Sequence, residues 1–194
     1  MADRVRVRFA PSPTGEPHIG NIRTAIFDWL FARHFGGEFI IRVEDTDQSR
    51  KVEGAVEAML DSLKWLGIDW DEGPDIGGDF GPYYQSQRLE HYQEAAETLL
   101  TSGDAYRCFC SSERLVELRK QQQAERADVT GYDGKCAELS ESETSDRSGA
   151  GEPSVIRFKM PDDGVTEGAD QIHGKVSFEN RLLDDFVIIK SDGF

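Results

Sequence analysis

The sequence predicts an α/β fold with a parallel sheet in its first hundred residues, followed by a smaller α+β unit. The first part contains short segments rich in β-forming residues. Between them lie longer segments whose apolar residues recur at helical spacing. The first pattern is typical of strands and the second of helices. A repeated strand–helix order requires crossover connections, which place successive strands parallel in one sheet.

Glycines mark the ends of two predicted helices, Gly36-Gly37 after the first and Gly67 after the second. A loop rich in Gly, Asp and Pro then occupies residues 68–84. The predicted strands are 4–9 and 38–43, and the predicted helices are 21–35, 52–66 and 86–100.

The character of the chain changes after Gly103. A strand at 105–110 precedes a charged helix at 111–127, for which Ser111 or Ser112 provides the cap. The stretch 138–152, rich in Ser, Glu, Asp and Gly, predicts an exposed loop or flexible excursion. Strand patterns return at 155–160, 175–178 and 186–190. We therefore divide the chain into residues 1–103, an α+β unit at 104–185 inserted into the first domain, and a return into that domain at 186–194.

Composition and charge exclude several classes of protein. The chain has 194 residues, and its hydrophobic content of 38% supports a buried core. A net charge of −15 argues against unspecific binding to nucleic acid or an anionic membrane, but allows a local basic surface for one structured RNA. No apolar run approaches the ~20 residues of a membrane span, and the amino terminus lacks a signal peptide's apolar core. Three cysteines, an odd number, favour a reducing cytoplasm over a disulfide framework.

The loop RFAPSPTGEPHIGN, residues 8–21, joins the first predicted strand to the first helix. Ligands bind at this end of the strands in open parallel sheets, and a helix amino terminus offers unpaired N–H groups to an anion. Gly15 and Gly20 permit close approach of a ligand, and His18 can donate a hydrogen bond to a phosphate oxygen. The alternative is a proline-stiffened turn whose histidine only caps the helix.

The same loop resembles the first signature of the class I aminoacyl-tRNA synthetases, and its APSPTG string resembles the glutamyl branch of that family. Asn21 stands at the second histidine of the His-Ile-Gly-His signature, a position where glutamyl enzymes often vary. Further strings resemble bacterial-type glutamyl-tRNA synthetases in the same order along the chain: RVEDTD (42–47), YYQSQR (83–88), YRCFC (106–110) and YDGKC (132–136).

This resemblance implies a Rossmann-like nucleotide-binding fold with an inserted domain that binds the acceptor end of tRNA(Glu). It implies that ATP and Mg²⁺ activate L-glutamate to glutamyl-adenylate, from which the glutamyl group passes to the 3′ end of the tRNA. The full-length enzyme is expected to be a cytoplasmic monomer without membrane contact. The implied site residues are His18, Gly20 and Asn21 for catalysis, Pro11, Ser12, Thr14, Gly15, His18 and Gly20 for ATP, and Arg8, Ala10, Ser12 and Glu44 for glutamate.

Free glutamate carries an ammonium and two carboxylates, so its pocket needs an anion and a fork of cations. By analogy with the family, Glu44 receives the ammonium and Arg8 pairs with a carboxylate. The alternative for Arg8 is the exposed end of a strand. The EDTD string (44–47) has two alternatives, a cap for helix 52–66 through Thr46 or Asp47, or a Mg²⁺ site.

The three cysteines form a candidate metal site. Side chains two apart in a strand face the same side, so Cys108 and Cys110 can point at one metal ion. Cys136 follows in a turn, and thiolates suit tetrahedral Zn²⁺. The resemblance adds Tyr132 as a fourth ligand in some relatives, whereas Glu138 stands where others have histidine. The alternative is three reduced thiols without metal.

Two other functions compete with the synthetase. One is the paralogue that attaches glutamate to queuosine in the tRNA for aspartate, which usually has a shorter connection than the 25 residues between Cys110 and Cys136. The other is a non-catalytic RNA-binding module. The resemblance also implies an amino-terminal part of a longer enzyme, so we expect this chain alone not to charge tRNA. In the inserted unit, we expect tRNA contacts from Arg114, Arg119, Lys120 and Arg126.

Overall fold

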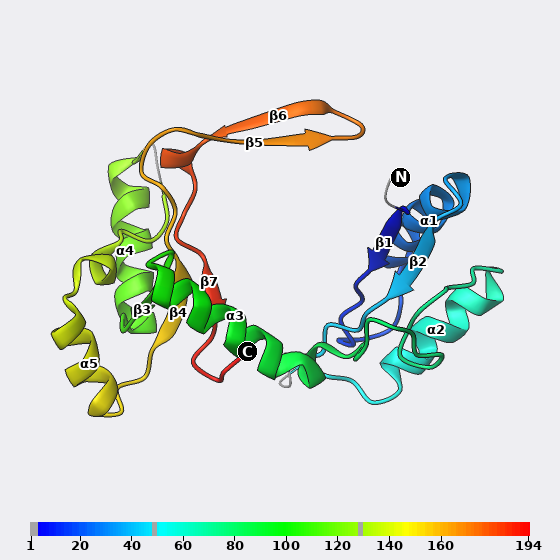
Figure 1. Ribbon diagram of the computed structural model, residues 1–194, viewed down its shortest axis with the longest axis horizontal. Helices are drawn as coiled ribbons and strands as arrows, with labels where there is room; N and C mark the ends of the chain where they lie inside the picture. Colours follow the sequence, from blue (N-terminus) through cyan, green and yellow to red (C-terminus); the bar gives the residue numbers. More distant parts are fainter. Residues whose placement is uncertain (1–3, 48–49, 128–129) are drawn as a thin grey trace. The chain divides into compact units, whose positions relative to one another are not determined.

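Two parallel strands and the helix between them form the beginning of the fold (Figure 1). The computed structural model describes residues 4–47, 50–127 and 130–194. Strand β1 (Arg6–Phe9), helix α1 (Ile19–His34) and strand β2 (Glu38–Ile41) follow one another, and Arg6 pairs with Glu38 and Phe9 with Ile41. The predicted parallel pairing of these strands is confirmed. Single parallel bridges from Ile40 to Glu72 and from Val43 to Tyr84 extend the pairing beyond the strands.

The turn between α1 and β2 depends on its two glycines. Gly36 has a φ of 61°, in the left-handed region that other residues rarely adopt. A Cβ atom on Gly37 would lie 2.3 Å from the carbonyl oxygen of Val5, so only glycine fits at that approach.

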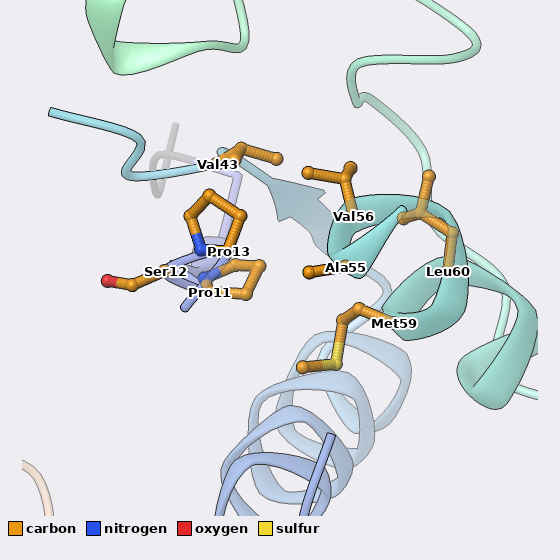
Figure 2. Close-up of a pocket in the computed structure, with 8 residues that line it drawn as sticks. All are labelled: Pro11, Ser12, Pro13, Val43, Ala55, Val56, Met59 and Leu60. Carbon is orange, nitrogen blue, oxygen red and sulfur yellow. The ribbon is translucent and has the colours of Figure 1, made fainter. Parts of the chain in front are cut away.

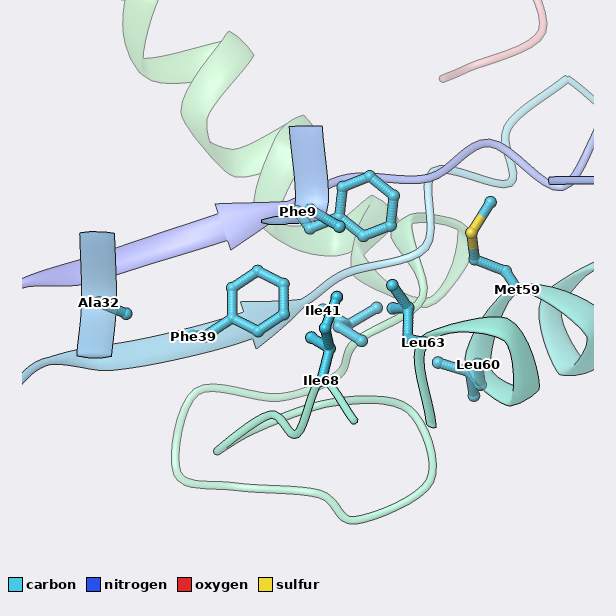
Figure 3. Packing of buried hydrophobic residues seen from close by; sticks show 9 residues of the cluster. Phe9, Ala32, Phe39, Ile41, Met59, Leu60, Leu63 and Ile68 are labelled. Atoms are coloured by element: carbon cyan, nitrogen blue, oxygen red, sulfur yellow. The ribbon is translucent and has the colours of Figure 1, made fainter. Parts of the chain in front are cut away.

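Helix α2 (Ala55–Trp65) and the loop after it close one core against the parallel strands. Figure 3 shows side chains from β1, β2, α2 and this loop gathered in one cluster. Strand β1 alternates in the expected way, with Phe9 buried and Arg6 and Arg8 on the exposed side. The buried cluster consists of Phe9, Ala25, Ala32, Phe39, Ile41, Met59, Leu60, Leu63 and Ile68.

The chain divides into two compact units, Met1–Leu89 and Glu90–Phe194. In the second unit, helix α3 (Leu89–Ser102) packs Ala96 in a cluster with Ala105 and Ile156. This division falls before the sequence-based boundary at 103/104, because the apolar face of α3 packs with the strands that follow it. A short 3₁₀ helix, η1 (Gln85–Arg88), precedes α3.

The second unit contains a three-stranded antiparallel sheet in the order β3, β4, β7 and a separate hairpin of β5 and β6. Its strands are β3 (Ala105–Cys108), β4 (Val155–Phe158), β5 (Val165–Asp170), β6 (Gly174–Glu179) and β7 (Val187–Ile189). Its remaining helices are α4 (Ser112–Glu125), η2 (Lys135–Glu138), α5 (Glu141–Gly149) and η3 (Asn180–Leu182).

The prediction of a loop at 138–152 is wrong, because most of this stretch forms α5. Ser140 caps the helix by accepting a hydrogen bond from the Glu143 amide, and the Glu143 side chain bonds the Ser140 amide in return. Strand β5 was also missed, since every residue of it is exposed and its sequence has no apolar alternation. In the described residues, none of the helices has the length and apolar character needed to cross a membrane.

We expect Leu63→Ala to destabilise the first unit by about 2–5 kcal/mol, because Leu63 is fully buried and its loss leaves a cavity. Urea unfolding followed by tryptophan fluorescence measures this unit alone, since Trp29, Trp65 and Trp70 all belong to it. Leu66→Ala, at a position 42% exposed, is the matched control and should cost much less. Equal losses from the two variants would contradict this packing.

Candidate functional site

Backbone hydrogen bonds continue past the ends of β1 and β2 and bring two predicted site residues together. The Arg42 amide donates to the Phe9 carbonyl at 3.0 Å, and the Glu44 amide donates to the Pro11 carbonyl at 2.9 Å. The loop after β1 is therefore held against the segment after β2. As a result Arg8, near the end of β1, faces Glu44.

Arg8 and Glu44 form an ion pair at the end of the parallel strands. Arg8 Nη1 lies 2.7 Å from Glu44 Oε1, and Arg42 Nη2 lies 3.6 Å from the same oxygen. Both side chains of the closer pair are partly exposed, so exchanging partners for a ligand costs at most about 1 kcal/mol. Arg42 was not among the predicted site residues, although it opens the RVEDTD string, because the sequence does not show that its side chain reaches Glu44.

A carboxyl group on α1, that of Asp28, also interacts electrostatically with Arg8. Burial raises the pKa of Asp28, and the Arg8 guanidinium lowers it in part. Arg42 Nε is buried without a hydrogen-bond partner in the described part of the chain. The arrangement offers one carboxylate, Glu44, between two guanidiniums. It can bind a small molecule that carries both an ammonium and a carboxylate.

His18 caps helix α1 and has a defined orientation. The Gly20 amide donates to His18 Nδ1 at 3.1 Å, while the His18 amide donates to Asn21 Oδ1 at 3.3 Å. Because Nδ1 accepts, the neutral ring carries its proton on Nε2, an assignment from the hydrogen-bond network. His18 is exposed at the positive end of the helix dipole, and its Nε2–H can donate to an anion. The capping alternative and the anion-binding prediction are therefore compatible.

Gly20 and Asn21, predicted as catalytic, have structural roles in this cap. A Cβ atom on Gly20 would lie 2.9 Å from His18 Cε1, so a larger residue displaces the imidazole ring. Asn21 accepts the reciprocal bond of the capping box. The helix begins two residues before the predicted start because His18 supplies this cap.

The residues predicted to bind ATP lie along one loop with different exposures. Pro11 and Pro13 are buried, whereas Ser12 and Thr14 are exposed. Ala10 is half-buried, and Gly15 has open space where a Cβ atom would lie. Figure 2 shows the two proline rings beside Val43 and α2, with the Ser12 hydroxyl pointing away from the apolar side chains. The cavity between them has a volume of about 10 Å³, which is no larger than a water molecule needs. A ligand of this loop therefore binds on its exposed side.

The EDTD string has a role that the sequence did not indicate. Asp45 is buried, and its two carboxylate oxygens accept from the Ser86 amide at 2.9 Å and the Ser86 hydroxyl at 2.7 Å. Asp45 thus caps the first turn of η1 from a distant part of the sequence. The predicted cap of the following helix by Thr46 or Asp47 is wrong, since α2 begins after Gly54 and has no side-chain cap.

The four predicted metal ligands lie together in the second unit. The sulfur atoms of Cys108, Cys110 and Cys136 lie within 4.8 Å of one another, and those of Cys110 and Cys136 are 3.6 Å apart. Tyr132 Oη lies 3.3 Å from Cys108 Sγ and 3.5 Å from Cys110 Sγ, and it accepts a hydrogen bond from the Cys136 amide at 2.9 Å. Residues from β3, from the segment that follows it, from the loop after α4 and from η2 therefore lie around one centre.

The surroundings change the pKa values of the cysteine thiols and the Tyr132 hydroxyl in different directions. Burial raises the pKa of Cys108, but the stronger combined effect of hydrogen bonds with Tyr132, the Cys110 backbone and Arg157 lowers it. Burial and the neighbouring thiols raise the pKa of Cys110, although the Tyr132 hydrogen bond opposes this. Burial, followed by hydrogen bonds with the cysteines, raises the pKa of Tyr132. Like charges this close disfavour one another. A cation beside the cluster would therefore favour its ionised form.

We expect Gly20→Ala to weaken the cap of α1 and to release the His18 ring from its position. Alanine normally stabilises a helix by up to about 1 kcal/mol over glycine, so a net loss of stability would reveal the clash. Nitrogen chemical shifts of His18 should change from the Nε2–H form toward a mixture of tautomers. Gly149→Ala, where a Cβ atom meets nothing, is the control. An unchanged His18 spectrum in Gly20→Ala would refute this description of the cap.

Comparison with known proteins finds relatives along the whole chain. A Glutamate--tRNA ligase of Dehalococcoides mccartyi strain 195 is 60% identical over the whole chain, and one of Natranaerobius thermophilus is 52% identical over 99% of it. The chain spans 38% and 39% of the length of these two relatives.

Solved structures give the same result. The crystal structure of a glutamate tRNA ligase from Elizabethkingia meningosepticum in complex with its amino acid matches 98% of this chain with a TM-score of 0.88 and 42% identity. The glutamate-tRNA synthetase of Elizabethkingia anophelis matches 98% with a TM-score of 0.89 and 42% identity. This chain covers 39% and 40% of those two chains. The family description "tRNA synthetases class I (E and Q), catalytic domain" matches residues 4–194, and the chain belongs to this family.

Proposed function

We propose that this chain is the amino-terminal catalytic part of a glutamate–tRNA ligase. The observation that carries the proposal is the Arg8–Glu44 pair, with Arg42 beside it, at the end of the two parallel strands, the first of which leads into the His18-capped helix. The names and 60% identity of relatives over the whole chain support it. In this reaction L-glutamate and ATP give glutamyl-adenylate, and the glutamyl group then passes to the 3′ end of tRNA(Glu).

The charges suggest how the two small substrates bind. Glu44 accepts hydrogen bonds from the ammonium of glutamate, and this releases Arg8 and Arg42 to pair with carboxylates. The family resemblance adds Ala10 and Ser12 to this glutamate site. His18 Nε2–H and the start of α1 donate to the phosphates of ATP, while Pro11, Thr14, Gly15 and Gly20 give the loop its shape. Magnesium accompanies ATP and neutralises its phosphates.

The wider organisation follows the same proposal. The first unit is the amino-terminal part of a Rossmann-like catalytic domain, and the second unit, in which the predicted return at 186–194 contributes β7 to the sheet, is an inserted domain for the tRNA acceptor end. We place the enzyme in the cytoplasm as a monomer. Arg119 and Arg126 are the better candidates for phosphate contacts, since Arg114 pairs with Asp133 and Lys120 lies 3.9 Å from Glu117.

A chimera tests the function directly. We expect the D. mccartyi ligase, with its matching segment replaced by this chain, to charge tRNA(Glu) with labelled glutamate. In the chimera, Glu44→Gln should lower kcat/KM for glutamate about 10- to 150-fold, because it removes a hydrogen bond to a charged group worth ~1.5–3 kcal/mol. The KM for ATP should change little.

Glu38→Gln is the matched control, because Glu38 also pairs with arginines, Arg4 and Arg6, but at the opposite end of the strands. It should leave kcat/KM for glutamate near that of the unmodified chimera. A folded chimera that does not charge tRNA would contradict the function. An active chimera in which Glu44→Gln has no effect would contradict the role of Glu44 alone.

We further propose that Cys108, Cys110, Tyr132 and Cys136 hold a structural Zn²⁺ ion. A tetrahedral zinc ion with Zn–S bonds of about 2.3 Å separates two sulfur ligands by about 3.8 Å, and a sulfur from an oxygen ligand by about 3.5 Å. The Cys110–Cys136 distance of 3.6 Å and the Tyr132 distances of 3.3 and 3.5 Å fit these values. Such an ion would link β3 to η2 and would take no part in the chemistry.

We expect the chain, purified under reducing conditions and given zinc, to retain one zinc ion after dialysis. Chelation should lower the thermal midpoint of the second unit, because binding to the folded state alone stabilises it. Cys136→Ser should lose the zinc while the tryptophan-reported stability of the first unit is unchanged. Metal analysis and circular dichroism measure both effects, and a reduced, folded chain that retains no zinc would contradict the proposal.

A further inference from the structure

Two arginines from different elements approach the thiol cluster of the second unit. Arg114 lies in the first turn of α4, and Arg157 lies on β4, which pairs with the cysteine-bearing strand β3. Figure 1 shows α4, β3 and β4 close together within this unit. Neither residue belongs to the set of four metal ligands proposed above.

Arg114 bridges the cluster and a neighbouring carboxylate. Its Nη1 lies 3.5 Å from Cys110 Sγ, and its Nη2 donates to Asp133. The amide of Arg114 donates to the Ser111 hydroxyl that caps the helix, at 3.3 Å. The backbone of Arg114 is therefore fixed in the capped helix turn, and its guanidinium is held by two acceptors. Its planar fork suits two acceptors at once, which an ammonium cannot match.

Arg157 is the more deeply buried of the two, with 6% of its surface exposed. Its guanidinium lies over the Tyr132 ring at 4.0 Å, and its Nη1 donates to the Asp185 carbonyl oxygen. Its Nε has no hydrogen-bond partner in the part of the chain that the structure describes. A buried cation is costly unless negative charge lies close to it. Thiolates at Cys108 and its neighbours would supply that charge.

The charge of a filled site completes the argument. Three thiolates and a tyrosine oxygen around Zn²⁺ leave a net charge of −1 or −2, depending on the phenol proton. Groups outside the ligand shell commonly orient ligands and stabilise such charge. We infer that Arg114 and Arg157 are positioning residues of this metal site, which hold Cys110 and Tyr132 in place and offset the negative charge of the bound metal. This inference rests on the proposed zinc site.

The competing explanation is that Arg114 only ties α4 to the loop at Asp133 through an ion pair. The two explanations differ in what Asp133→Asn does. If Arg114 acts on the metal, Asp133→Asn keeps the cation beside Cys110 and affects zinc affinity much less than Arg114→Met. If the ion pair alone matters, the two variants lower zinc affinity equally.

The experiment measures zinc affinity of the reduced 194-residue chain by competition with a chromogenic chelator. We expect Arg114→Met to raise the zinc Kd about 10- to 100-fold, the usual effect of losing a group that supports a metal ligand. Arg114→Lys should give an intermediate value, because it keeps the charge and loses the fork. Arg181→Met, at an exposed arginine of the same unit that pairs with Glu179, is the matched control and should bind zinc like the unmodified chain.

Cobalt(II) provides a readout that a purely structural role would not change. The absorption bands of bound Co²⁺ report the geometry and ligands of the site, and we expect them to shift in Arg114→Met and in Arg157→Lys. Circular dichroism shows whether each variant is folded. If Arg114→Met does not fold, Arg114→Lys replaces it in both measurements. Zinc affinity and cobalt bands equal to those of the unmodified chain in folded Arg114 variants would overturn the inference alone. Failure of the unmodified chain to bind zinc would overturn it together with the zinc proposal.

Discussion

The continued backbone pairing beyond β1 and β2 is the constraint on which the first candidate site depends. Two amides, those of Arg42 and Glu44, donate to carbonyls of Phe9 and Pro11, and a third bond joins the Val52 amide to the Pro13 carbonyl at 2.9 Å. These bonds hold the loop after β1 although it contains no regular strand. Without them, the segment that carries Glu44 would not be held beside the loop that follows Arg8 and β1. The charge pair is therefore a consequence of the sheet.

The same pairing determines which side of the loop can meet a ligand. Pro11 and Pro13 pack toward α2 and leave only a water-sized cavity there, so the loop cannot move inward. Ser12 and Thr14 alternate with them and are exposed. A loop anchored on one side and polar on the other is already ordered before a ligand arrives. Little conformational entropy then needs to be lost on binding.

Sequence patterns predicted those elements whose stability comes from burial. The strand that ends in Phe9, the helix that contains Leu63 and their parallel arrangement all follow from apolar spacing, and the structure confirms them. Elements held by local polar bonds were harder to predict. Helix α5 depends on the Ser140–Glu143 capping box, a signal that was present but was outweighed by polar composition. Asp45 could not be assigned from sequence, because Ser86, its partner, lies 41 positions away.

The site residues show the same difference between partners that are close in sequence and partners that only the fold brings together. The family motif contains His18, Gly20 and Asn21, but only the fold shows that they make one cap, in which the imidazole leaves room for glycine alone. Arg42 lies in the RVEDTD string without a predicted role, and Arg157 lies in no motif, because the roles of both depend on partners brought near by pairing of separate strands. Motifs therefore record residues whose neighbours are close in sequence, and they miss residues that act through the tertiary fold.

In the candidate metal site, a tyrosine in place of a histidine ligand changes how much positive charge the surrounding residues must provide. Within the described residues, the group of possible metal ligands contains the three cysteines and no carboxylate, so Glu138 does not replace the histidine of other relatives. Tyr132 is placed to do so, yet burial and the nearby thiols raise the pKa of its hydroxyl. A tyrosine ligand thus needs more positive charge nearby than a neutral histidine does. The guanidinium over its ring at 4.0 Å and the Cys136 amide at 2.9 Å lie where that charge and hydrogen bonding are needed.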